Sequence, residues 1–249
     1  MITIKSNREI LLMEKAGKAV AEVLEIVGNM IAPGMTTLDI DKIVEEEIRK
    51  RNMIPAFKGY NGFPGSACVS INEEVVHGIP SDKKVICDKD IVSVDIGTIY
   101  KGYYGDAART FPVGNVSKEA ERLIEITKDS FYEGLKYCKV GYRLSDISHA
   151  IQKYIEDNKC FVVKDFVGHG IGKNMHEEPQ IPNYGDPGRG IRLAAGMVFA
   201  IEPMVNLGTE DVEVLLDNWT VVTADGSLSA HYEHTVVLTE DEPIILTRI

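Results

Sequence analysis

The chain has 249 residues, of which 44% are hydrophobic and 26% charged, a composition typical of a globular protein that can bury a full core without disulfides or structural metal. Its 27 Lys and Arg against 38 Asp and Glu leave a net charge of −11, which argues against stable binding to nucleic acid or to an anionic membrane. The four cysteines are widely spaced, and no stretch resembles a membrane span or a secretory signal. We therefore expect a cytoplasmic protein with reduced thiols.

The first expected element is an amphipathic helix. Ser6 and Glu9 form a capping-box pattern ahead of apolar residues at helical spacing, and the helix should end near Pro33–Gly34. A second helix should begin at about Thr36 and carry an apolar face through Ile48.

The same order of elements returns later in the chain. Ser117 should cap a helix that runs to about Cys138, and a turn at Gly141 should precede a fourth helix. Four residues recur with a constant offset of 107 positions, namely Gly34, Asp39, Ile40 and Ile48 with Gly141, Asp146, Ile147 and Ile155. This repetition predicts an internal duplication within a single domain, 1–249, with halves at about 9–115 and 116–249.

Asp95 is the most informative position in the first half. It interrupts a strand in which Val92, Val94 and Ile96 alternate on one face. A second strand is expected over 103–113, and a turn near 100–102 would place Asp106 roughly opposite Asp95. Two buried carboxylates at that spacing repel each other unless a cation lies between them or one is protonated. A structural ion pair between Asp95 and Arg109 is the alternative.

The second half offers a matching set of polar residues. The strand Val198–Glu202 corresponds to Ile91–Asp95 at the same offset of 107, Glu233 precedes another apolar run, and each half contains a His-Gly-Ile triplet, at His77–Ile79 and His169–Ile171. One imidazole from His169 with four carboxylates suits two closely spaced divalent ions better than a tetrahedral zinc site. Such a pair can activate water and polarise a carbonyl, which favours amide hydrolysis; the charge of −11 and the lack of a phosphate-binding loop count against phosphoesters.

An ordered set of motifs covering nearly the whole chain resembles the methionine aminopeptidases. The motifs are Val76–Pro80, Asp95 with Asp106, Gly168–Gly172, His176–Pro179, Glu202–Pro203 and Glu233–Thr235. The resemblance implies an α+β pita-bread fold, in which two pseudo-symmetric αβ halves surround a curved antiparallel sheet. The sequence resembles the short bacterial type, type I, in having neither a long N-terminal extension nor zinc-finger cysteines.

The resemblance also implies roles for individual residues. Two divalent ions would be held by five side chains, of which Asp106 and Glu233 bridge, and Glu202 would also shuttle a proton. His77 would hydrogen-bond the peptide nitrogen or the leaving amine, and His176 would steady the scissile carbonyl. The full set of implied ligands is Asp95, Asp106, His169, Glu202 and Glu233.

A methionine side chain needs an apolar pocket with polarisable or aromatic walls. The resemblance assigns this lining to Tyr60, Phe63, Cys68 and Trp219. Two other positions depart from the bacterial pattern: Phe57 stands where cysteine is common, and Met175 where an aromatic residue is usual. These departures are expected to alter pocket depth or inhibitor sensitivity rather than the preference for methionine.

The expected reaction is removal of the initiator methionine from nascent proteins whose second residue is small. The expected cofactors are two ions of cobalt, manganese, iron or zinc, and the expected partners are methionyl peptides and nascent chains, with transient ribosome contact and a monomeric state. Three alternatives stay open: a proline-adjacent aminopeptidase of the same fold, an inactive peptide-binding scaffold, and a metal-dependent phosphoesterase.

Overall fold

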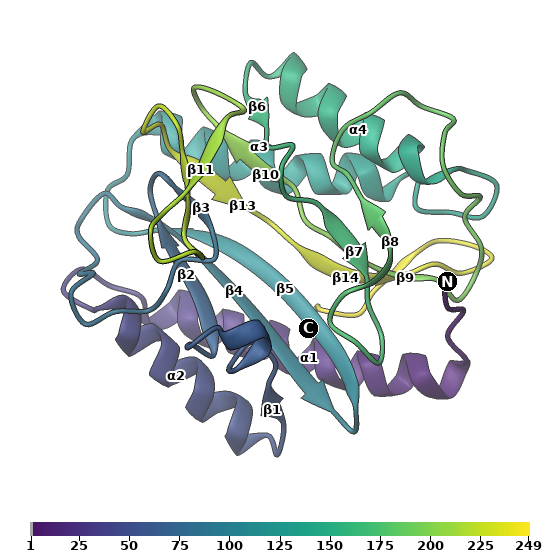
Figure 1. Ribbon diagram of the computed structural model, residues 1–249, viewed down its shortest axis with the longest axis horizontal. Helices are drawn as coiled ribbons and strands as arrows, with labels where there is room; N and C mark the ends of the chain where they lie inside the picture. Colours follow the sequence, from purple (N-terminus) through teal and green to yellow (C-terminus); the bar gives the residue numbers. More distant parts are fainter. Residues whose placement is uncertain (1) are drawn as a thin grey trace.

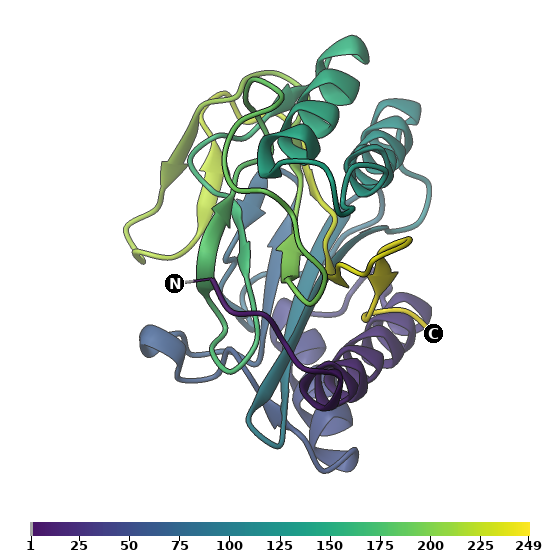
Figure 2. The ribbon, with the colours of Figure 1, turned by 90° about the vertical axis from the view of Figure 1, so that its right-hand side faces the viewer.

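The computed structural model describes residues 2–249. Its helices and strands mix along the chain, and every strand pairing is antiparallel. Figures 1 and 2 show the long helices on one side of the strands, with α1 and α2 beside the first-half strands and α3 and α4 beside the second-half strands. The architecture is the expected α+β arrangement of two αβ halves. The helices are α1 (Asn7–Met30), α2 (Thr37–Lys50), α3 (Lys118–Leu135) and α4 (Leu144–Asp157), with a short 3-10 turn η1 (Tyr60–Gly62).

The strands fall into four small sheets. A first-half sheet has the order β1–β4–β2, with β5 paired to β4, and a second-half sheet has the order β15–β14–β9–β7–β8; two further sheets are β13–β10–β6 and β11–β12–β3. The strand bounds are β1 Ile54–Pro55, β2 Ala67–Ile71, β3 Glu74–Val76, β4 Ile91–Tyr100, β5 Tyr103–Pro112, β6 Phe161–Val162, β7 Gly168–Gly170, β8 Glu177–Ile181, β9 Val198–Ile201, β10 Met204–Asn206, β11 Val212–Val214, β12 Val221–Thr223, β13 Ser229–His231, β14 His234–Val237 and β15 Ile244–Ile245.

The helix starts follow from local capping chemistry. The Ser6 amide donates to Glu9 Oε2 at 2.9 Å, which confirms the predicted capping box of α1, and Ser117 Oγ accepts from the Ala120 amide at 3.1 Å at the start of α3. The predicted ends were a few residues late, since α1 ends at Met30 and α3 at Leu135.

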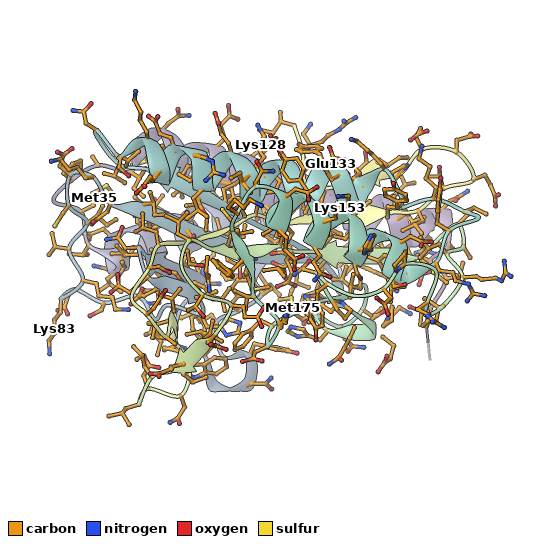
Figure 3. The ribbon with its side chains drawn as sticks, turned by 90° about the horizontal axis from the view of Figure 1, so that it is seen from above. Met35, Lys83, Lys128, Glu133, Lys153 and Met175 are labelled. Carbon is orange, nitrogen blue, oxygen red and sulfur yellow. The ribbon has the colours of Figure 1, made fainter. Side chains whose placement is uncertain are left out.

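Each helix pair covers its own apolar core. Val20 and Val44 of the first pair pack with Val94 of β4, while Leu123 and Ile151 of the second pair pack with Phe199 of β9. Burial of these faces fixes which side of each strand points to the helices, and therefore which side carries polar groups. In Figure 3, Lys128 and Glu133 of α3 lie on one side of the molecule and Met175 lies toward the other.

The approach of α1 to β5 depends on two glycines. A Cβ on Gly17 would lie 2.5 Å from the Leu246 carbonyl oxygen, and one on Gly105 would lie 2.5 Å from the Gly17 amide nitrogen. A side chain at Gly105 would push the helix away from the strand that carries Asp106, and one at Gly17 would push it away from the C-terminal segment at Leu246.

The elements of the two halves recur at the predicted spacing. α2 and α4 each contain 14 residues, and β1 and β6 follow them at the same interval. The isolated bridges Thr36↔Val85 and Arg143↔Arg192 are also separated by 107 positions. The His-Gly-Ile triplets do not follow this spacing. Ser93 of β4 pairs with Ser70 of β2, which lies before the first triplet, whereas its counterpart Ala200 of β9 pairs with His169, which belongs to the second triplet.

Within residues 2–249, no helix combines the length and apolarity required to cross a bilayer.

Candidate active site

A cavity of about 270 Å³ is bordered by η1 and by residues adjoining β12, which lie on the side of the strands away from the helices (Figure 2). It contains every site residue predicted from the sequence. Residues separated by more than 170 positions therefore meet at one place. The predicted residues that line it are Tyr60, Phe63, Cys68, His77, Asp95, Asp106, His169, His176, Glu202, Trp219 and Glu233.

Asp95 and Asp106 reach the cavity from the hairpin β4–β5. Its turn consists of Lys101 and Gly102, which both have positive φ, and this tight turn fixes the strand register. Asp95 lies opposite Ala108, and Asp106 lies opposite Gly97. The two carboxylates are therefore diagonal neighbours on one face, which corrects the prediction that they lie roughly opposite each other.

Arg109 does not pair with Asp95. It lies opposite Val94, on the other face of the hairpin. Its guanidinium donates to the Ala108 and Glu233 carbonyl oxygens, each at 2.7 Å, and stacks 4.2 Å from the centre of the Tyr232 ring. The alternative of a structural ion pair for Asp95 is therefore wrong.

The second half supplies its polar groups where strands are interrupted. Glu202 directly follows β9, Glu233 lies between β13 and β14, and His169 is in β7. His169 Nε2 lies 3.5 Å from Glu202 Oε1 and 4.0 Å from Asp106 Oδ2. A close cluster is formed by one ligand atom from each of Asp106, His169 and Glu233. These three atoms all lie within 4.8 Å of one another. Asp95 was predicted to end its strand as Glu202 does, but β4 continues to Tyr100.

Burial dominates the electrostatics of this cluster. Loss of hydration raises the pKa of Asp106 to about 7 and raises the pKa values of Asp95, Glu202 and Glu233, with the charge of Asp106 adding to the effect on all three. Burial lowers the pKa of His169 to about 3, so its imidazole is neutral. Four carboxylates therefore compete for protons, and a cation would relieve their repulsion.

The donor set fits divalent metal. Among residues 2–249, Asp95 Oδ1, Asp106 Oδ1 and Glu233 Oε1 are buried side-chain oxygens without a hydrogen-bond partner, which is costly unless a cation binds them. His169 Nδ1 lies 2.9 Å from the Gly170 carbonyl oxygen, so Nδ1 carries the proton and Nε2 is free to ligate. Oxygen-rich sets with one imidazole suit several divalent metals.

Three other side chains frame the region beside the carboxylates. The Tyr60 hydroxyl lies 2.8 Å from His176 Nδ1, and the rings of His169 and His176 have centroids 4.2 Å apart. His77 adopts a positive φ of 59° and packs edge-on against Trp219, at 6.2 Å between ring centroids. Burial lowers the pKa of His77 to about 4, so this imidazole is also neutral at pH 7.

The remaining wall is apolar. Phe63 and Trp219 meet edge to face at 5.1 Å, and Cys68 lies opposite Asp95 on β2. Burial raises the pKa of the Cys68 thiol, which is therefore protonated.

The two unusual positions, Phe57 and Met175, both line the cavity. They share a space that a glycine leaves open: a Cβ on Gly97 would lie 2.6 Å from Phe57 Cε1 and 3.0 Å from Met175 Cε. Gly97 also pairs with Asp106. Phe57 and Met175 therefore pack over Gly97, opposite the residue that carries one of the cluster carboxylates.

Sequence reasoning missed several residues that also line the cavity, including Phe166, Met204 and His231. His231 had a usable signal, because it stands two positions before Glu233 and an extended chain places such residues on one face. Phe166 had none, since its place depends on contact with His77 across the halves, at 5.5 Å between ring centroids.

The chain is similar to known proteins over its full length. The model of metallopeptidase family M24 matches residues 11–240. A methionine aminopeptidase of Clostridium acetobutylicum is 56% identical, with 99% of each chain covered, and methionine aminopeptidase 1 of Bacillus subtilis is 53% identical, with 100% of each covered. The crystal structure of a methionine aminopeptidase from Thermotoga maritima superposes with a TM-score of 0.99 at 49% identity, with 100% of each chain covered. The chain thus belongs to metallopeptidase family M24.

Proposed function

We propose that this chain is a metal-dependent aminopeptidase that removes the initiator methionine from nascent proteins when the second residue is small. The observation that carries the proposal is the single cavity in which four carboxylates, with Asp106 and Glu233 buried and Asp95 and Glu202 half-buried, and a neutral imidazole adjoin an apolar wall. The full-length similarity to proteins named methionine aminopeptidase supports the same reaction.

Two divalent ions would be held by Asp95, Asp106, His169, Glu202 and Glu233. Asp106 and Glu233 suit bridging because each lies in the close cluster and keeps a buried oxygen without a partner among residues 2–249. When bound, the ions supply Lewis acidity that activates the attacking water and polarises the scissile carbonyl. Cobalt, manganese, iron and zinc all suit the donor set.

Glu202 is the candidate proton shuttle. Its raised pKa, caused by burial and by the charge of Asp106, brings the carboxylate closer to the range in which it can both accept and release a proton. We propose that Glu202 takes a proton from the attacking water and returns it to the leaving amine.

The two catalytic histidines act on the substrate. With the Tyr60 hydroxyl as the donor to His176 Nδ1, the proton of this neutral ring would lie on Nε2, which could then donate to the developing oxyanion. His77, held between Phe166 and Trp219, would bond the peptide nitrogen or the leaving amine. Tyr60, Phe63, Cys68 and Trp219 would receive the methionine side chain.

The remaining assignments complete the proposal. The protein would act in the cytoplasm as a monomer on methionyl peptides and nascent chains, with transient contact to ribosomes. The two halves would descend from a duplication of one αβ unit, with 1–249 as one catalytic domain; the equal lengths of α2 and α4 and the shared spacing of the bridges support this.

The test is release of free methionine from Met-Ala-Ser by chelator-stripped protein before and after addition of Mn²⁺ or Co²⁺. Leu-Ala-Ser and Met-Leu-Ser are the controls. Metal-dependent release from Met-Ala-Ser alone is expected. Equal cleavage of Met-Ala-Ser and Met-Leu-Ser would contradict the small second residue, activity on the leucine peptide would contradict the methionine pocket, and inactivity with every metal would favour a binding scaffold.

A further inference from the structure

His231 ends β13 with its side chain buried, at 2% exposure, and it lines the cavity. Its Nε2 is a buried nitrogen without a hydrogen-bond partner among the residues described. Leaving such a group unpaired costs on the order of 1–3 kcal/mol. The atom faces Glu202, whose Oε2 lies 3.9 Å away. This separation is too long for a hydrogen bond but close enough to become one.

The backbone holds His231 firmly in this place. Its amide donates to Thr110 Oγ1 at 2.9 Å, and the same hydroxyl donates to the His231 carbonyl oxygen at 2.9 Å. Ser93 supports that hydroxyl from β4, with 2.8 Å between the two side-chain oxygens. The backbone of His231 is therefore held in place by side chains of the first half of the chain.

The strand registers give His231 a defined relation to Glu202. Asp106 lies opposite Gly97, two residues after Asp95. His231 lies opposite Met204, two residues after Glu202. His231 thus stands to Glu202 as Asp106 stands to Asp95, so the fold places a polar side chain beside each of these carboxylates.

We propose that His231 is a positioning residue for Glu202, and that its Nε2–H donates a hydrogen bond to Oε2 when the site is in its working state. Glu202 Oε1 is then left facing His169, whose Nε2 is 3.5 Å away. The two carboxylate oxygens would therefore have separate roles, with Oε2 anchored by His231 and Oε1 left available for metal binding and proton transfer. The inference rests on the proposed function in its use of Glu202 as ligand and proton shuttle.

The test compares two substitutions at this position. In His231→Gln the side-chain amide can still donate to Oε2, whereas His231→Leu fills the space and cannot. Outer hydrogen-bond partners of metal ligands are typically worth roughly 10–100-fold in affinity or activity. We expect His231→Leu to lower both kcat on Met-Ala-Ser and Mn²⁺ affinity, measured calorimetrically on chelator-stripped protein, by about tenfold or more, with KM nearly unchanged. His231→Gln should restore most of both.

His149→Leu is the matched control, because His149 lies on α4 and contacts the Gly185 carbonyl oxygen outside the site. Thermal melts identify any variant that fails to fold. If the leucine variant fails, His231→Asn replaces it, since its shorter amide cannot reach Oε2. The double variant His231→Leu, Glu202→Gln should lose no more activity than Glu202→Gln alone, because His231 acts through Glu202.

Wild-type kcat and metal affinity in a folded His231→Leu protein would overturn the inference. A rise in KM with unchanged kcat would also overturn it, because His231 would then contact substrate instead. Failure of the proposed function is distinguishable, since in that case the wild-type protein itself would release no methionine or bind no Mn²⁺.

Discussion

The two halves build their parts of the site in different ways. In the first half, Asp95 and Asp106 project from a continuous hairpin of two ten-residue strands. In the second half, Glu202 and Glu233 stand where short strands are interrupted, and side chains from elsewhere hold their backbones. Arg109 donates to the Glu233 carbonyl oxygen at 2.7 Å, and Asn183 Nδ2 to that of Glu202 at 3.0 Å.

This difference has a physical reason. In the first half the strand ladder orients the two aspartates, and the Asp106 backbone has one further partner, because Thr235 Oγ1 accepts from the Asp106 amide at 3.0 Å and donates to the Asp106 carbonyl oxygen at 2.8 Å. Where a strand is interrupted, the backbone can take other conformations that direct a glutamate side chain toward the site. Its carbonyl groups then lack partners in the strand ladder and need other hydrogen-bond donors. Apart from its dependence on Thr235, the first half should therefore tolerate loss of peripheral side chains, whereas the second half should depend on Arg109 and Asn183.

The largest effect is expected where the halves meet. Asp106→Asn keeps the shape of the side chain but removes a charge from the cluster, and kcat/KM should fall by about 10³-fold or more. The metal-free protein should become more stable at pH 8, because a buried carboxylate with a raised pKa is removed. Peptide assays and melts of chelator-treated protein measure both effects, with Asp157→Asn on the exposed end of α4 as control. A variant of normal activity would remove Asp106 from the ligand set.

A second prediction concerns the pH dependence of metal binding to the shared cluster. The folded pKa of Asp106 is raised to about 7, and those of Asp95, Glu202 and Glu233 are raised as well. Below these values protons occupy the oxygens that would bind metal, so binding must displace them. The apparent Mn²⁺ dissociation constant should fall by about tenfold per pH unit for each proton displaced, from pH 5.5 to 7.

The same raised pKa values have a consequence for stability. A carboxyl group whose folded pKa exceeds its unfolded value stabilises the fold at low pH, and this contribution is lost as pH rises through the folded pKa. The metal-free protein should therefore lose the contribution of Asp106 between about pH 4 and 7.

The prediction for metal binding is tested separately. Calorimetry in two buffers of different ionisation enthalpy would measure the protons released when Mn²⁺ binds, and an Mn²⁺ dissociation constant independent of pH would contradict the linkage.

Arg109→Met tests the dependence of the second half more directly. It removes the Arg109 donor of the Glu233 carbonyl oxygen and the stacking on Tyr232, while the Ala108 carbonyl oxygen keeps its bond from the Glu233 amide at 3.0 Å. The free energy of unfolding should fall by about 2 kcal/mol, and metal affinity should fall because Glu233 is displaced. Urea unfolding of metal-free and metal-loaded protein separates the two effects. Arg49→Met, which removes an exposed ion pair to Glu45, should change stability by less than about 0.5 kcal/mol.

The smallest effect is expected for Asn183→Leu. The substitution removes the hydrogen bond that Asn183 Nδ2 donates to the Glu202 carbonyl oxygen at 3.0 Å. The free energy of unfolding should therefore fall by about 1 kcal/mol. Metal affinity should weaken less than in Arg109→Met. If both variants match the wild-type protein in urea unfolding and metal titration, the second half needs no more support than the first, and the contrast between the halves is wrong.

Local chemistry explains what the sequence made predictable. Capping at Ser6 and Ser117 and the helical spacing of apolar residues are encoded by neighbours in the chain, and the alternation around Asp95 indicated a buried carboxylate without reference to distant residues. The matching carboxylates of the two halves and His169 indicated the five candidate ligands, the resemblance added their individual roles and the pocket residues, and the structure brings all of them to one cavity.

Long-range pairing explains what could not be predicted. The diagonal placement of Asp95 and Asp106 depends on a turn confined to Lys101 and Gly102, and a shift of the turn by one residue would change every partner. The His-Gly-Ile triplets looked equivalent in sequence. In the structure, His169 lies in β7 and pairs with β9, whereas His77 lies in a loop after β3. An identical tripeptide therefore does not determine whether its residues lie in a strand or in a loop.

Anomalous X-ray diffraction from crystals soaked in Mn²⁺ would locate metal at the junction of the two halves. We predict two peaks per chain, roughly 3.5–4 Å apart, with Asp106 and Glu233 between them, Asp95 on the first-half side, and His169 and Glu202 on the second-half side. A single peak, or peaks away from these five side chains, would contradict the claim that the two halves jointly hold a pair of metal ions.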